Sequence, residues 1–155
     1  MNFDYAVFPK LGKAGLEVVV HNSHGNAIAS LSKQAPLLFS PVFVEAMAAA
    51  RVITFAQELG IKEFVLKGDS EVVITTLQST EVSLTTYGHL LESAKSILTT
   101  SKCIAFIHIR RIGNRVAHNL AKHVDMLEVC RCGWKIFHHT SMMYSLLIPA
   151  DFLIK

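Results

Sequence analysis

The stretch KEFVLKGDSEVVITTL, Lys62–Leu77, decides how the rest of the chain is understood. The apolar run Phe64–Leu66 is too short for a helix and has the length of a buried strand. Gly68 interrupts that run, and from Glu71 onward the apolar residues recur with helical spacing. Asp69 is therefore predicted to lie where a buried strand ends and a helix begins. In α/β sheets ligands and catalytic groups gather at this edge, which makes Asp69 the first candidate functional residue.

The composition predicts one intracellular domain. The chain has 155 residues, a formal charge of +3, eight histidines and three cysteines. An odd number of cysteines does not suggest a disulfide framework, so we expect a reducing compartment, cytoplasm or nucleus. The N-terminus does not resemble a signal peptide, and no apolar run reaches the roughly 18 residues of a membrane span. We predict a domain over residues 1–125 and a tail, partly packed or disordered, over residues 126–155, without clean periodicity.

The pattern before and after this stretch predicts a mixed sheet. Alternation over Asn2–Phe8 and β-branched runs over Leu16–His21 and Ala27–Ser32 indicate three antiparallel strands, the last two joined by a turn at Asn22–Asn26. A helix is predicted from Ser40 to Leu59, with Ser as its cap and Pro at its first position. The elements predicted after the opening stretch are a helix with apolar residues Leu90, Leu91, Ala94, Ile97 and Leu98, a strand over Ile104–Ile109, and a helix with the apolar side Val116, Ala117, Leu120, Ala121 and Val124. Such an order favours an α/β sheet covered by helices.

Two more acids stand at positions suited to metal chemistry. Asp4 lies on the first predicted strand, and Glu45 heads an apolar stripe of the first long helix. Carboxylates that converge from different elements are the ligands Mg²⁺ prefers, and a pair of such ions can hydrolyse a phosphodiester. From the helix alone, a solvated first-turn Glu favoured by the helix dipole is the simpler explanation of Glu45. Acids at strand ends are also often solvated or serve as helix caps, so spacing alone leaves both explanations open.

Several motifs in this order resemble plant reverse-transcriptase-like domains of the ribonuclease H type. They are NFDYAVF, AGLEVVVHNSHGNAIAS, SPVFVEAMAAARVITFAQELG, FVLKGDSEVVI, TTYGHLLESAK and HIRRIGNRVAHNLAKH, from about Asn2 to about His123. The resemblance implies a ribonuclease H-like fold, with a five-stranded mixed sheet (three antiparallel strands, then two parallel) and helices on both faces. It also implies metal-dependent endonucleolytic cleavage of the RNA strand in RNA–DNA hybrids. Mg²⁺ is the expected cofactor, with Mn²⁺ as an alternative.

The resemblance also assigns the site residues. Asp4, Glu45 and Asp69 match the family's metal-binding acids, and His118 falls at the fourth catalytic position. That position is commonly Asp in active ribonucleases H. Imidazole is a poorer ligand for Mg²⁺ than carboxylate and suits manganese or iron better. It also suits general acid–base catalysis, or a structural bond to nearby backbone. A second departure is Tyr5, where the family usually has Gly and where a bulky side chain narrows the approach to the site.

Substrate contacts are less clearly marked in the sequence. Arg110, Arg111, Asn114 and Arg115 lie beside the proposed site, where they would meet phosphates or form a solvated positive surface. Asn22 in the hairpin turn would touch the minor groove of a hybrid, although it suits the turn itself at least as well.

Three functions remain open from the sequence. The first is a hydrolase acting on RNA–DNA hybrids, and the second is a catalytically weak or inactive nucleic-acid-binding module derived from a retroelement. The third is a protein-interaction domain that uses the apolar tail. The tail also carries Cys130, Cys132, His138 and His139, whose spacing fits zinc poorly. We expect a monomer with no membrane association.

Overall fold

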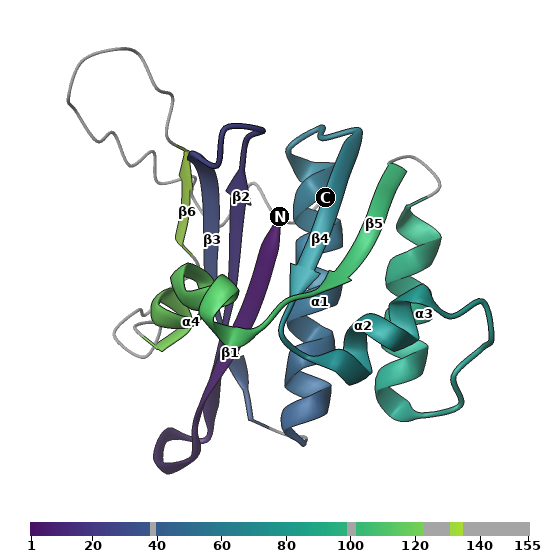
Figure 1. Cartoon of the computed structure of the whole chain (residues 1–155). Helices are drawn as coiled ribbons and strands as arrows, with labels where there is room; N and C mark the ends of the chain where they lie inside the picture. The colour runs from purple at the N-terminus through teal and green to yellow at the C-terminus, as the bar shows by residue number, and fades with distance from the viewer. Residues whose placement is uncertain (38–39, 99–101, 123–130, 135–155) are drawn as a thin grey trace.

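The computed structural model describes residues 1–37, 40–98, 102–122 and 131–134. A single mixed sheet with strand order β5-β4-β1-β2-β3-β6 runs through these residues, and helices cover both of its faces (Figure 1). The strands are β1 (Asn2–Phe8), β2 (Lys13–His21), β3 (Ala27–Pro36), β4 (Glu63–Gly68), β5 (Lys102–His108) and β6 (Arg131–Trp134). The first three strands are antiparallel, whereas β1, β4 and β5 run parallel. This confirms the predicted fold.

The sixth strand was not predicted. β6 pairs antiparallel with β3, with Ala29 opposite Trp134 and Ser32 opposite Arg131. It lies inside the segment that the sequence assigns to a tail, where no alternating pattern marks a strand. The division of the chain at residue 125 stays a prediction. The rest of the tail, including Cys130, His138 and His139, lies outside the described residues, so its predicted partial packing or disorder also stays a prediction.

The sheet divides between β1 and β4. β1 is in register with β2 over its whole length, but with β4 it shares only the registered pair Asn2 and Lys67. Beyond that pair the two parallel strands diverge (Figure 1). The chain leads from β1 by a short turn to β2 on one side of this point, and from β4 by a helical connection to β5 on the other side, and the carboxyl end of β4 lies beside the point. In open α/β sheets ligands bind at such a switch point.

The described residues form four α-helices: α1 (Pro41–Glu58), α2 (Glu71–Gln78), α3 (Thr86–Ile97) and α4 (Arg115–Lys122). α1 packs on one face of β1 and β2, and α4 packs on the other. The alternation of β1 explains this arrangement. Phe3 is fully buried in the core that includes α1, whereas Asn2 and Asp4 contact the 3-10 helix η2 (Arg111–Asn114) and α4 on the other face. Ser40 stands at the N-cap of α1 as predicted, although its side chain makes no capping hydrogen bond.

The predicted apolar side of the last helix is partly wrong. Ala117 and Ala121 are buried, but Val116 is 54% exposed and Leu120 is 39% exposed. Val124 lies outside the described residues. The apolar face predicted for this helix included more residues than the face that packs. α4 packs on β1 and β2 through its two buried alanines, whose small side chains allow a close approach of helix and sheet. Within the described residues, no helix is both long and apolar enough to cross a membrane.

Candidate metal centre

Three carboxylates from three separate elements meet at the switch point. Asp4 comes from β1, Glu45 from the first turns of α1, and Asp69 from the loop that follows β4. One carboxylate oxygen of each lies within 4.8 Å of those of the other two. Asp4 is 0% exposed and Glu45 is 3% exposed, so neither is a solvated surface acid. The simpler explanation that the sequence offers for Glu45, a solvated first-turn residue, is therefore wrong.

Two hydrogen bonds hold the Asp4 carboxylate in place. The backbone N–H of Tyr5 donates to Asp4 Oδ1 at 2.7 Å, and Asn114 Nδ2 donates to Asp4 Oδ2 at 3.2 Å. Asn114 Nδ2 also donates to the carbonyl of Phe3 at 2.7 Å, and Asn114 Oδ1 accepts from Asn2 Nδ2 at 3.1 Å. The predicted substrate contact through Asn114 stays a prediction; in the structure this side chain is 1% exposed and bonds Asn2, Phe3 and Asp4.

Burial disfavours ionisation of the two buried acids, Glu45 and Asp4. It raises the pKa of Glu45 to about 9, and the neighbouring charges of Asp4 and Asp69 add to the rise. Burial likewise raises the pKa of Asp4 to about 7, against the bond from the Tyr5 N–H, which lowers it. Without a counter-charge the cluster is electrostatically unfavourable, and a bound cation relieves both the desolvation and the repulsion. The donor set, carboxylate oxygens at one spot, suits a hard divalent cation.

Asp69 is positioned by the junction between β4 and α2. The N–H of Ile109 donates to the carbonyl of Gly68 at 2.9 Å, so the pairing between β4 and β5 extends to the residue directly before Asp69. Ser70, the next residue, accepts from Val73 N at 3.5 Å and caps α2, which leaves the Asp69 carboxylate free of the capping role. Arg111 Nε lies 3.3 Å from Asp69 Oδ2, and the Arg111 side chain is 66% exposed. An exposed guanidinium therefore stands at the mouth of the acidic cluster.

His118 lies in the first turn of α4, as predicted, and faces the cluster. Its Nδ1 is 3.3 Å from Asp4 Oδ2, and its side chain is 14% exposed. Burial lowers the pKa of His118, and the positive charges of Arg111 and Lys122 lower it further. The imidazole is therefore neutral around neutral pH, a form in which one ring nitrogen accepts a proton or binds a metal.

A family model described as "Reverse transcriptase-like" matches residues 2–124. The chain belongs to this reverse transcriptase-like family. Solved structures that resemble it include ribonucleases H, so the fold is that of a ribonuclease H-like domain. No curated protein matches the chain.

Three of these structures illustrate the likeness. RNase H1 from the archaeon Halobacterium salinarum superposes with a TM-score of 0.71 at 21% identity, covering 81% of this chain and 95% of that one. LC11-RNase H1, from compost, in complex with an RNA/DNA hybrid gives 0.69 at 22% identity, covering 81% and 95%. The N-terminal RNase H domain of a Mycobacterium tuberculosis protein, fused to maltose binding protein, gives 0.65 at 17% identity, covering 80% and 93%. At these identities the likeness concerns the fold alone.

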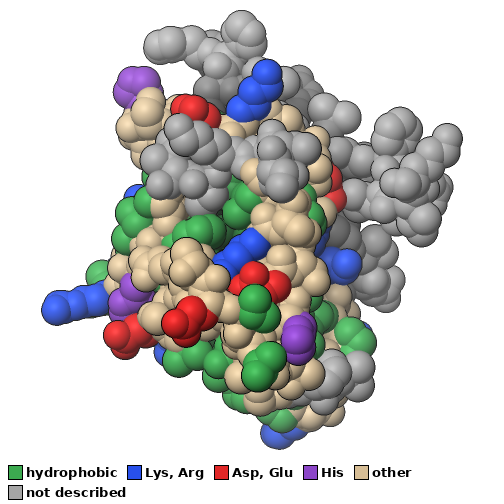
Figure 2. Space-filling model, turned by 90° about the vertical axis from the view of Figure 1, so that its right-hand side faces the viewer, with side chains coloured by type: hydrophobic (Ala, Val, Ile, Leu, Met, Phe, Trp, Pro, Cys, Tyr) green, Lys and Arg blue, Asp and Glu red, His purple; other side chains and the backbone are tan. Residues whose placement is uncertain are grey.

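The residues predicted to contact substrate fall into different settings in this ribonuclease H-like domain. Asn22 Oδ1 accepts from the N–H groups of His24 and Asn26, both at 3.0 Å, which is the turn-forming role. Arg110 and Arg115 are exposed, whereas Arg111 contacts Asp69. The face at the β5 side of the molecule carries basic and acidic side chains side by side rather than one continuous basic patch (Figure 2).

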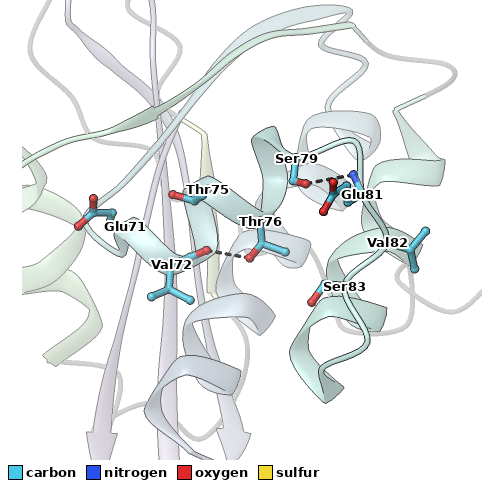
Figure 3. A pocket seen from close by; sticks show the side chains of 8 residues that line it. All are labelled: Glu71, Val72, Thr75, Thr76, Ser79, Glu81, Val82 and Ser83. Carbon is cyan, nitrogen blue, oxygen red and sulfur yellow. Dashed lines mark hydrogen bonds between the residues drawn. The ribbon is translucent and has the colours of Figure 1, made fainter.

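A hollow of about 520 Å³ lies between α2 and the segment that leads to α3 (Figure 3). Its charged lining residues are both acids, Glu71 and Glu81. Four hydroxyl side chains, Thr75, Thr76, Ser79 and Ser83, complete most of the lining. Because phosphates are repelled by carboxylates, this hollow is a poor place for a nucleic-acid backbone.

Sequence reasoning missed two buried polar residues of the ribonuclease H-like domain. The first is Asn114, whose hydrogen bond to Asp4 was not predicted. The second is Glu17 on β2, which lies directly opposite Asp4 and is 0% exposed. Glu17 accepts a hydrogen bond from Ser32 Oγ on β3. A signal for Glu17 is present in the sequence, because an acid interrupts the otherwise apolar strand over Leu16–Val20. The bonds of Asn114 have no comparable local signal.

Proposed function

We propose that this domain binds RNA–DNA hybrids and hydrolyses the RNA strand with the help of divalent metal ions. Asp4, Glu45 and Asp69 would hold the metal, and His118 would assist. The observation that carries the proposal is the convergence of the three carboxylates, two of them buried, within 4.8 Å at the switch point of a ribonuclease H-like sheet. Burying acids without a counter-charge is costly, so their presence together favours the binding of a cation.

Mg²⁺ or Mn²⁺ fits the donor set. Bound there, the ion would supply Lewis-acid chemistry, by which the attacking water is activated and the leaving oxygen is stabilised. Asp4 and Glu45 would give up their protons on loading, and the bonds from Tyr5 N and Asn114 Nδ2 would keep the Asp4 carboxylate oriented. The neutral imidazole of His118 would hold or pass a proton beside Asp4. A ring nitrogen so close to a metal-binding oxygen favours Mn²⁺ over Mg²⁺.

The substrate is inferred by analogy. LC11-RNase H1, a structural neighbour, is known in complex with an RNA/DNA hybrid. Exposed Arg110 and Arg115, together with Arg111 at the mouth of the cluster, would meet backbone phosphates and give salt-dependent affinity. Fold analogy alone does not establish function, so the acids and the arginines carry the argument.

The test is cleavage of a labelled RNA–DNA hybrid in Mg²⁺ or in Mn²⁺, with wild type compared to Asp69→Asn. We expect the substitution to abolish metal-dependent cleavage, because one of the three ligands loses its charge. The matched control is Glu71→Gln, an exposed acid two residues further along, which should cleave like wild type. Equal rates for wild type and Asp69→Asn would reject the catalytic proposal.

A second candidate is hybrid binding without turnover. The observations that favour it are His118, an imidazole beside Asp4 Oδ2, and Tyr5, a bulky residue directly after Asp4. Under this alternative, hybrid binds to the wild-type domain in a gel-shift assay at low salt, yet neither metal supports cleavage. Cleavage that depends on Asp69 excludes it.

A further inference from the structure

A second cavity lies on the α4 face of the sheet, behind the acidic cluster. Its volume is about 280 Å³, and its polar lining comes from Asn2, His21, Lys67 and Asn114. Asn2 and Lys67 form the one registered pair between β1 and β4, so the cavity lies where these strands are still joined. The acidic cluster lies just beyond, where the strands have separated. None of the polar lining residues is an acid.

The charged side chain in the lining of this cavity is the cation Lys67. Lys67 is half-buried and, within the described part of the chain, its ammonium forms no ion pair. His21 is close enough to interact electrostatically with Lys67. Burial lowers the pKa of His21 most, and the ammonium groups of Met1 and Lys67 lower it further. A partly buried cation attracts an anion more strongly than an exposed one does, because the local dielectric is lower.

We propose that this cavity binds a phosphate group, with the Lys67 ammonium as its charge partner and the side chains of Asn2 and His21 as hydrogen-bond donors. Asn2 uses one of its two amide hydrogens on Asn114 Oδ1, at 3.1 Å, which leaves the other hydrogen for a ligand. Lys67 offers three donors. Pockets for drug-sized ligands measure roughly 300–1,000 Å³, so a cavity of about 280 Å³ suits a small anion better than a whole nucleotide.

This anion site is connected to the acidic cluster through two hydrogen bonds. Asn2 Nδ2 donates to Asn114 Oδ1, and Asn114 Nδ2 donates to Asp4 Oδ2 at 3.2 Å. Asn114 therefore forms a wall of the cavity and, at the same time, orients a carboxylate of the candidate metal centre. A phosphate bound to Asn2 would change the hydrogen bond between Asn2 and Asn114. The chemical shift of the Asn114 side-chain amide should therefore report whether the cavity is occupied.

The experiment titrates the full chain with inorganic phosphate while a chelator keeps divalent metal away from the carboxylates. The readouts are the side-chain amide signals of Asn2 and Asn114 in ¹H–¹⁵N spectra, together with calorimetry. We expect a saturable shift of both signals. Lys67→Met should weaken phosphate binding at least tenfold, which corresponds to about 1.4 kcal/mol. Lys67→Arg should keep it, and Lys62→Met, an exposed lysine that does not line the cavity, should leave it unchanged.

A second set of titrations identifies the source of the phosphate. A short oligonucleotide with a 5′-phosphate and the same oligonucleotide with a 5′-hydroxyl are compared with inorganic phosphate. Lys67-dependent binding of free phosphate, or of the 5′-phosphorylated strand over the hydroxyl form, supports the site and shows whether a free or a terminal phosphate occupies it. No saturable shift, or an equal shift in correctly folded Lys67→Met, overturns the proposal. Because these readouts need neither metal nor cleavage, they stand apart from the test of the nuclease.

Discussion

Replacing Glu45 by Gln should stabilise the metal-free protein at neutral pH, although it removes a candidate metal ligand. Glu45 is 3% exposed, and burial with the nearby charges of Asp4 and Asp69 raises its pKa from 4.5 to about 9. In the unfolded chain this carboxyl is ionised above pH 4.5, whereas in the folded chain it stays protonated up to about pH 9. Folding therefore takes up a proton between these limits, and stability falls as the pH rises through them.

The magnitude follows from the width of that window. One pH unit corresponds to about 1.4 kcal/mol for one proton, so the distance from pH 4.5 to neutral pH costs the wild type about 3 kcal/mol. Gln has nearly the same shape as Glu, and its side chain does not ionise in this pH range. Glu45→Gln should therefore exceed wild type in free energy of unfolding by up to about 3 kcal/mol near neutral pH, and the difference should shrink toward zero as the pH approaches 4.5.

The assay is urea denaturation in chelator at acidic, neutral and mildly alkaline pH. The control is Glu58→Gln on the same helix, where an exposed acid loses a 2.8 Å ion pair with Arg51. That loss should cost no more than about 1 kcal/mol, so this control should not be more stable than wild type. Added Mn²⁺ should stabilise wild type, by about 2.7 kcal/mol at 100 times its Kd, and Glu45→Gln by much less. A variant less stable than wild type at neutral pH, or a difference that does not change with pH, would refute the electrostatic account.

Three further outcomes are expected. Gly68→Ala should lower the free energy of unfolding by about 1–3 kcal/mol in urea, because its Cβ would lie 2.3 Å from Cζ of the buried Phe3 ring; an unchanged midpoint contradicts the close packing. His118→Asp should raise Mg²⁺-dependent cleavage of hybrid in initial-rate assays, whereas a fall would assign the imidazole a chemical role of its own. Metal binding near neutral pH should release about one to two protons, because Asp4 and Glu45 must ionise; calorimetry in buffers of different ionisation enthalpy measures this release, and a value of zero would count against loading by these acids.

Much of the fold is predictable because its signals are local. The change from strand to helix around Asp69 is visible in the spacing of apolar residues, and β4 and α2 occur on either side of it. The alternation of Asn2–Phe8 places Asp4 on one face of β1, and the structure has it on the face that contacts His118. Ser40 and Pro41 mark the start of α1 in both. These features depend on neighbours within a turn or a strand.

What the sequence could not predict depends on depth and on distant contacts. The helical face of Glu45 is predictable, but its burial depends on where β1 and β4 diverge, which no pattern within α1 encodes. The exposure of Val116 and Leu120 has the same origin, since an apolar residue on a short helix is buried only if another element reaches it. The bonds of Asn114 join residues more than 100 positions apart, as the separation of 110 from Asp4 shows.

Asn114 also connects the geometry of the sheet to the placement of the carboxylate. On the side of β1 that faces β4, the Met1 carbonyl accepts from Lys67 N at 2.8 Å, and the next carbonyl on that side is that of Phe3. The strands have separated there, and Asn114 Nδ2 takes the place of a strand N–H at 2.7 Å. The same nitrogen donates to Asp4 Oδ2. A buried carbonyl left without a donor would cost about 1–3 kcal/mol, so the divergence of the two strands requires a donor at this point, and the residue that supplies it also orients the Asp4 carboxylate.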